Sequence, residues 1–172
     1  MAAHPKHDAV RGRYHGCCGY SGVSEEDAGG ELTIDHFVPI ADGGDDRDDN
    51  LVYCCFRCNL YKSALSPTER DRAAGHVVLH PLCDDPTLHV RLDVSSGLLD
   101  ALTETGRFHI TLLHLNRPAL VAHRLRCRRA ELHAAKQQLL EAENSELRAI
   151  VAAQQKYISR LRQLLANEPP ER

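Results

Sequence analysis

Four polar side chains in the first third of the chain have the types and spacing that phosphodiester hydrolysis needs. Asp35 and His36 are adjacent, Asn50 follows after a loop with two glycines, and Asn59 comes nine residues later. Hydrolysis requires a base that takes a proton from water, and an imidazole does this well near neutral pH. It also requires a divalent cation that neutralises the developing charge, and Asp and Asn oxygens suit Mg²⁺. The pattern therefore predicts a metal-dependent hydrolytic site.

Each of these residues, taken alone, has an ordinary interpretation. The chain contains 11 histidines, so any single one is more often a surface residue than a base. Asn50 could be a turn residue, and Asn59 could cap the helix expected to follow it. Only the combination, at this spacing and beside the Cys55-x-x-Cys58 pair, favours a chemical role.

The combined pattern resembles the HNH endonuclease family. The resemblance covers about residues 14–64 and has Asn59 at the last motif position, which is the HNN variant of the family. It is carried by Asp35-His36-x-x-Pro39, by the Gly43-Gly44 loop, by Asn50-Leu51, and by Cys55-x-x-Cys58-Asn59-x-x-Lys62.

This resemblance implies a ββα-metal fold and hydrolysis of DNA with Mg²⁺ (or Mn²⁺). By resemblance, His36 is the general base that activates water, and Asp35 and Asn59 hold the divalent ion. Asn50 holds the loop that orients His36.

The cysteines point to a second metal. The chain has 7 of them, an odd number, and several are clustered, which in a reducing compartment is typical of metal binding rather than disulfides. Many family members hold a structural zinc with two Cys-x-x-Cys pairs. Here Cys55 and Cys58 form the second pair, whereas the first reads Cys18-Gly-Tyr-Ser21, with a poor zinc ligand at its end.

Three arrangements of the zinc site remain open from the sequence. His15 lies three residues before Cys18 and could supply an imidazole nitrogen as the fourth ligand. Cys17 could turn inward instead, although adjacent side chains usually point apart. Alternatively, three thiolates and water hold the zinc, or the zinc has been lost.

Charge and hydropathy divide the chain. Residues 1–116 hold 10 Lys/Arg and 18 Asp/Glu, whereas residues 117–165 hold 10 Lys/Arg and 4 Asp/Glu. A polyanion such as DNA is therefore expected to contact the basic tail. The residues predicted to contact nucleic acid are Arg57 and Lys62 beside the catalytic turn, and Arg124, Arg126, Arg128 and Arg129 in the tail.

From residue 118 onward, apolar residues recur at spacings of three, four and seven without a helix breaker until Pro169-Pro170. The pattern predicts a long amphipathic helix whose apolar stripe is too long to be buried on so small a domain. A coiled-coil homodimer, or a docking helix for a partner, is the expected use of this stripe.

The sequence thus predicts an α+β protein with a small ββα-metal module and a long C-terminal helical extension. The expected parts are a flexible N-terminus (1–13), the nuclease module (14–66), a connecting α/β region (67–116) and a long basic helix (117–168). The absence of a signal-like or membrane-spanning apolar run leads to the expectation of a cytoplasmic protein with no membrane contact. The alternative function is a non-catalytic nucleic-acid-binding or assembly protein that retains the HNH shell.

Overall fold

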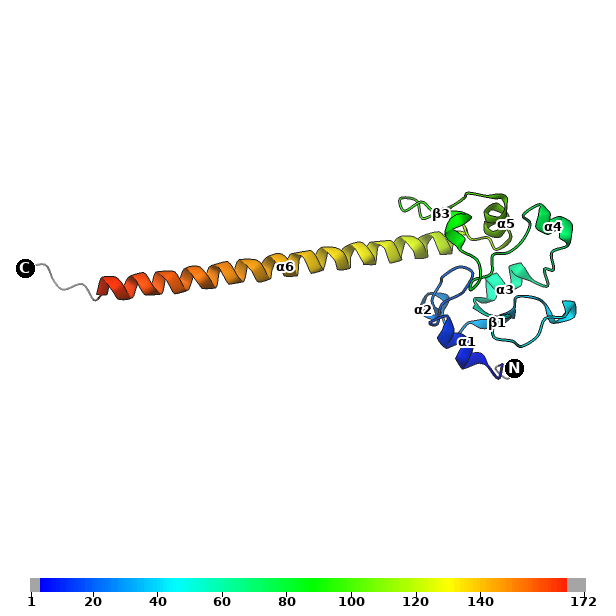
Figure 1. Cartoon of the computed structure of the whole chain (residues 1–172), viewed down its shortest axis with the longest axis horizontal. Helices are drawn as coiled ribbons and strands as arrows, with labels where there is room; N and C mark the ends of the chain where they lie inside the picture. Colours follow the sequence, from blue (N-terminus) through cyan, green and yellow to red (C-terminus); the bar gives the residue numbers. More distant parts are fainter. Residues whose placement is uncertain (1–3, 167–172) are drawn as a thin grey trace, which may run out of the picture. The chain divides into compact units, whose positions relative to one another are not determined.

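The computed structural model describes residues 4–166. The chain divides into two compact units, with the boundary between Cys127 and Arg128. Mixed helices and small sheets with a long C-terminal helix confirm the predicted α+β class (Figure 1). The elements outside the site are α1 (His7–Arg13), α2 (Glu25–Ala28), η1 (Ile40–Asp42), α4 (Glu69–Ala73), η2 (Pro86–Leu88), β3 (Val90–Leu92), β4 (Leu99–Ala101) and α5 (Glu104–Leu112).

The site is built on a short antiparallel hairpin followed by a helix. Strand β1 (Thr33–His36) pairs with β2 (Leu51–Cys54), and the ladder runs from the Thr33–Cys54 pair to the His36–Leu51 pair. All four residues of β2 are buried. Helix α3 (Phe56–Lys62) follows at once and ends at Ser63, whose φ of 50° lies in the left-handed region. This order, strand–strand–helix, is the ββα unit that the sequence predicted.

The ββα unit shares its hydrophobic core with the segments on both sides of it. Val10 from α1 and Leu113 are fully buried in the same cluster as Leu51 and Tyr53, and Leu120 from the first turn of the last helix joins them. A hairpin of this length is marginal by itself, because it has too little apolar surface to bury. The connecting region and the start of the last helix therefore complete the core of the ββα unit.

The N-terminal segment differs from its prediction. Residues 1–13 were expected to be flexible, but residues 7–13 form α1, and Val10 is completely buried. The sequence around Val10 does not indicate this helix, because a single apolar residue in a polar segment produces no hydrophobic periodicity. Residues 1–3 lie outside the described part of the chain.

The long C-terminal helix is present as α6 (Pro118–Ala166), a single continuous helix of 49 residues (Figure 1). The last two residues of the predicted span, 167–168, lie outside the described residues. Between residues 4 and 166, no helix is both long enough and apolar enough to cross a membrane.

Candidate active site and metal centre

Strand β1 presents its two most chemically active side chains to opposite faces of the hairpin. Side chains alternate along a strand, so Thr33 and Asp35 share one face and His36 points to the other. Asp35 is 7% exposed, whereas the side chain of His36 is 24% exposed. The two adjacent residues of the motif therefore have different surroundings.

The Asp35 carboxylate is held by a buried cation. The Lys62 ammonium lies 3.0 Å from Asp35 Oδ2 and also donates to the His36 carbonyl at 2.9 Å. The Tyr20 hydroxyl donates to Asp35 Oδ2 at 2.6 Å. Burial raises the pKa of Asp35, and the nearby Lys62 charge opposes that rise. Lys62 itself is only 2% exposed, so its charge is directed at Asp35 rather than at solvent.

Asn59 lies against the same face of β1 as Asp35. Its side-chain amide donates to Thr33 Oγ1 at 3.2 Å, and Thr33 is two residues from Asp35 on that face. Among residues 4–166, no hydrogen bond joins the side chains of Asp35, His36 and Asn59 to one another. The structure thus brings Asn59 and Asp35 to one side of the hairpin and leaves His36 on the other.

His36 is paired with a carboxylate from the acidic loop. Its Nε2 lies 2.7 Å from Asp46 Oδ1, and His4 Nε2 lies 3.3 Å from the same oxygen. Hydrogen bonds from His36 and then His4 lower the pKa of Asp46, so this carboxylate is ionised near neutral pH. An ionised carboxylate accepts from Nε2–H, which places the lone pair of a neutral His36 on Nδ1.

Asn50 closes the loop that carries Asp46. Its Oδ1 accepts from the Val38 backbone N–H at 2.7 Å, and its Nδ2 donates to the carbonyls of Val38 at 3.1 Å and Asp45 at 2.8 Å. The two sides of the loop are so close that a Cβ on Gly44 would lie 1.9 Å from the Val38 carbonyl oxygen. Only glycine fits there, which explains the second glycine of the motif.

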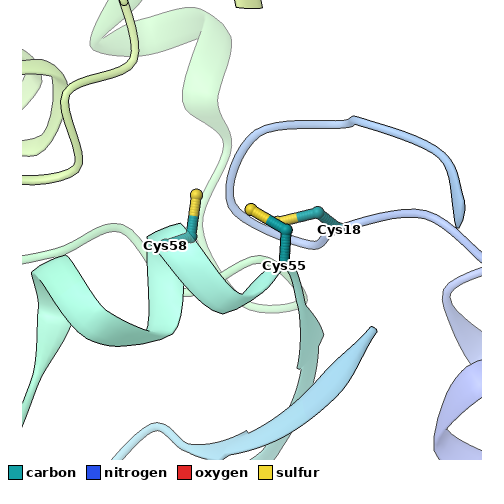
Figure 2. Close-up of side chains that lie close together, drawn as sticks. All are labelled: Cys18, Cys55 and Cys58. Atoms are coloured by element: carbon teal, nitrogen blue, oxygen red, sulfur yellow. The ribbon is translucent and has the colours of Figure 1, made fainter. Parts of the chain in front are cut away.

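Three cysteines form a buried cluster at the start of α3. The sulfur atoms of Cys18, Cys55 and Cys58 all lie within 4.8 Å of one another (Figure 2). Figure 2 shows Cys55 and Cys58 at the start of α3 and Cys18 on the loop facing them. The Arg117 guanidinium lies 3.6 Å from Cys55 Sγ and 3.8 Å from Cys58 Sγ. The close approach of the Cys18 sulfur lowers the pKa of Cys55 and raises that of Cys58.

The cluster fits a zinc ion with one weak ligand position. Three thiols at this separation can supply three of the four corners of a tetrahedral site. Ser21 occupies the sequence position of the missing fourth cysteine, and its hydroxyl is buried without a hydrogen-bond partner among the described residues. The neighbouring Cys55 raises the pKa of the Cys18 thiol, and the neighbouring Cys58 opposes that rise. A buried hydroxyl without a partner is costly, and a zinc ion or a zinc-bound water would satisfy it.

The two other candidates for the fourth position lie elsewhere. His15 is exposed, has a φ of 53°, and lines a shallow surface depression with Arg11 and Glu25. Cys17 is partly exposed, and its sulfur approaches the His15 carbonyl at 3.6 Å. The structure does not bring either residue to the three-cysteine cluster.

Some of the residues predicted to contact nucleic acid are bound to other groups of the protein, and others are exposed. Lys62 is buried on Asp35, and Arg124 donates to the carbonyls of Gly97 at 2.7 Å and Leu115 at 2.9 Å. Partial burial lowers the pKa of Arg124. Arg126 pairs with Asp27 at 2.7 Å, and Arg128 lies 3.3 Å from Glu131. Arg57 and Arg129 are exposed.

A comparison of the chain with protein-family models gave a match. Residues 16–65 match the HNH endonuclease family model. The match confirms the resemblance seen in the sequence and covers the hairpin, α3 and the three-cysteine cluster, but less than a third of the chain. No curated protein and no solved structure matches this chain.

Some partners of the HNH residues could not be found from the motif. Asp46 lies in a run of aspartates, none of which the sequence distinguishes from the others, and His4 lies in a segment predicted to be flexible. Tyr20 and Arg117 reach the site from distant positions along the chain. Arg117 begins the basic tail, whose charge indicated a contact with phosphate rather than with cysteine sulfur.

We expect Ser21→Cys to strengthen zinc binding, because a thiolate replaces a neutral hydroxyl at the fourth position. The gain should be at least about tenfold in affinity, since even outer-shell partners of zinc ligands change it by that amount. Competition against a chromophoric chelator measures it, with Cys17→Ser as the control that leaves affinity unchanged. A wild-type chain that retains no zinc, or equal affinities for wild type and Ser21→Cys, would contradict this assignment.

We expect Lys62→Met to lower the free energy of unfolding by about 3–5 kcal/mol, because it leaves a buried carboxylate without its cation. Adding Asp35→Asn to this variant should recover part of the loss, since the buried charge is then removed. Urea denaturation of the single and double variants measures both effects, with Lys156→Met on an exposed face of α6 as the control. Equal stability of Lys62→Met and wild type would show that the pair is not buried in solution.

Proposed function

We propose that the HNH segment is a metal-dependent endonuclease that hydrolyses DNA phosphodiester bonds with His36 as the general base. The observation that carries the proposal is the hydrogen bond between His36 Nε2 and Asp46, because it fixes the tautomer that a base requires. The family match to residues 16–65 supports the reaction class.

The proton path follows from the tautomer. Asp46 accepts a hydrogen bond from Nε2–H, so the Nδ1 lone pair of His36 is available to take a proton from water. The resulting imidazolium is stabilised by the ionised Asp46 carboxylate, in the way that a carboxylate supports a catalytic histidine in hydrolases. Asn50 holds the loop that positions Asp46, through its bonds to Val38 and Asp45.

Asp35 and Asn59 are the proposed ligands for the divalent ion, Mg²⁺ or Mn²⁺. They are oxygen ligands on one face of β1, which suits such an ion, and the ion would neutralise charge on the phosphate and the leaving oxygen. In the arrangement described, the Lys62 ammonium already neutralises Asp35. Binding of an ion there therefore requires Lys62 to withdraw from the carboxylate. Joint action of the ion and the base on one phosphate also requires the His36 side chain to turn from the opposite face of β1 toward the same side.

Arginines near the start of α3 offer a surface for the DNA backbone. Arg57, Arg117 and Arg126 line a pocket of about 380 Å³, together with the exposed side chain of Phe56. Phosphate contacts from arginine supply affinity without sequence selectivity, and such affinity decreases with salt. Arg117 and Arg126 are engaged by the cysteines and by Asp27, so we propose Arg57, rather than Lys62 or Arg124, as the residue of the first unit that contacts DNA.

Cleavage of supercoiled plasmid with Mg²⁺ or Mn²⁺ tests the proposed reaction. We expect wild type to cut, and His36→Ala to lose at least about 100-fold in rate, which is the usual contribution of a general base. His133→Ala, an exposed histidine of α6, is the matched control and should retain the wild-type rate. EDTA should abolish cutting.

A specific observation favours a rival function, a nucleic-acid-binding protein that retains the HNH shell without cutting. The buried Asp35–Lys62 pair is a stable arrangement in which Asp35 is unavailable to an ion. A folded wild type that shifts DNA in a gel but cuts no faster than His36→Ala would establish the rival and exclude the nuclease.

We also propose that α6 forms a coiled-coil homodimer in its second half. Residues 140–161 follow a three-four spacing there, with Glu143 and Gln154 as the polar positions in an otherwise apolar row, and a self-complementary stripe of this kind pairs with a second copy. The side chains of the stripe are all at least 41% exposed: Leu140, Leu147, Ile150, Tyr157 and Leu161.

Replacing Leu147 by Asp should convert the dimer to a monomer, because a charge would be placed in the centre of the paired stripe. Ala152→Asp, on the opposite side of the helix, should leave the dimer intact. Light scattering during gel filtration reports the mass of each variant. A monomeric wild type at micromolar concentration would rule out this homodimer.

A further inference from the structure

We propose that His4, His36 and Asp46 form a binding site for a transition-metal ion such as Zn²⁺ or Ni²⁺, and that an ion bound there blocks the base of the nuclease reaction. The binding site stands on geometry alone. The inhibitory effect rests on the proposed function of His36.

Three ligand atoms already converge at this point. His36 Nε2 and His4 Nε2 both approach Asp46 Oδ1, at 2.7 and 3.3 Å, and all three atoms lie within 4.8 Å of one another. The two imidazole rings meet edge to face, with centroids 6.1 Å apart. One ion can replace the shared protons at the centre of this group with little movement of the side chains.

The chain holds the two halves of the group together independently of any ion. The Lys6 ammonium donates to the Asp46 carbonyl and to Asp48 Oδ1, both at 2.8 Å, and Arg13 contacts Asp48 as well. Because α1 is anchored by the buried Val10, His4 is presented to the loop from a fixed segment. Such preorganisation reduces the entropy lost when an ion is bound.

The ligand set selects the class of ion. Two imidazoles and one carboxylate favour Zn²⁺, Ni²⁺ or Cu²⁺ over Mg²⁺, which prefers oxygen ligands and retains its water. The site also differs from the cysteine cluster, whose three thiolates are softer ligands. Transition metals therefore have two separate sites on this chain, and Mg²⁺ is not expected to use this one.

Inhibition follows from the position of the imidazole proton. An ion on Nε2 of His36 displaces the proton from that nitrogen, and a neutral imidazole then carries its proton on Nδ1. Nδ1 is the atom proposed to accept the proton of the attacking water. His4 changes in the same way, since its Nδ1 now accepts from the Lys6 backbone N–H at 3.2 Å and would carry the proton instead. That N–H is on an exposed residue, so water can replace the lost acceptor.

Binding of Ni²⁺ to untagged protein that has first been given one equivalent of Zn²⁺ tests the site. Titration calorimetry should show one further equivalent bound by wild type, and His4→Ala should weaken it by at least about tenfold. Asp46→Asn should weaken it as well, whereas His133→Ala should behave as wild type. Equal Ni²⁺ affinity in wild type and His4→Ala overturns the site.

Plasmid cleavage in Mg²⁺ with increasing Ni²⁺ tests the inhibitory effect, with each variant compared with its own rate without Ni²⁺. Half-inhibition of His4→Ala should require at least about tenfold more Ni²⁺ than that of wild type, in parallel with the binding data. Equal inhibition of both proteins overturns the inhibitory role. A chain that binds Ni²⁺ through His4 but never cuts DNA overturns the proposed function and its inhibition, and confirms the binding site.

Discussion

A ladder of only four residue pairs between β1 and β2 holds the whole site in place. Two strands of this length cannot stabilise themselves, because they bury too little apolar surface and leave most of their backbone at an edge. The positions of Asp35 and His36 therefore depend on supports outside the hairpin. These are the Asn50 side chain that closes the loop, the buried residues of α1 and α6, and the three cysteines that join α3 to the preceding loop.

Electrostatics divides the hairpin into two environments. On the face of Asp35, burial makes an isolated carboxylate expensive, so one buried ammonium from Lys62 offsets its charge. On the face of His36, the acidic loop is exposed and is balanced by the cations of the N-terminal segment, Lys6 and Arg13. The same strand therefore presents a buried carboxylate on one side and, on the other, an imidazole that lies beside the exposed carboxylate of Asp46.

The sequence predicted the features that are encoded by residues close to one another along the chain. The strand, the double-glycine loop, Asn50 and the start of α3 all fall within one short motif, and the family match confirms that motif. Contacts between distant segments could not be predicted in this way. The contact between His4 and Asp46 joins residues 42 positions apart, and nothing in the polarity of the N-terminal segment indicates where it docks. Lys62 was expected at the DNA, because a lysine beside a catalytic turn carries no sign of the burial that directs it to Asp35.

Arg117 lies outside the segment that matches the HNH family model and contacts two cysteines within it. Its guanidinium donates to the Leu113 carbonyl at the end of α5, at 3.0 Å, while its other nitrogen approaches two cysteine sulfurs. Donors of this kind stabilise thiolates, so Arg117 favours the deprotonated form of the cysteines that a metal ion would require. Ser21 stands at the sequence position of a fourth cysteine, so the cluster supplies three thiols, and the cation that faces two of them comes from outside the family motif. The start of α6 therefore contributes a side chain to the three-cysteine cluster. A truncation at residue 66 would remove this cation together with the core residues Leu113, Leu115 and Leu120.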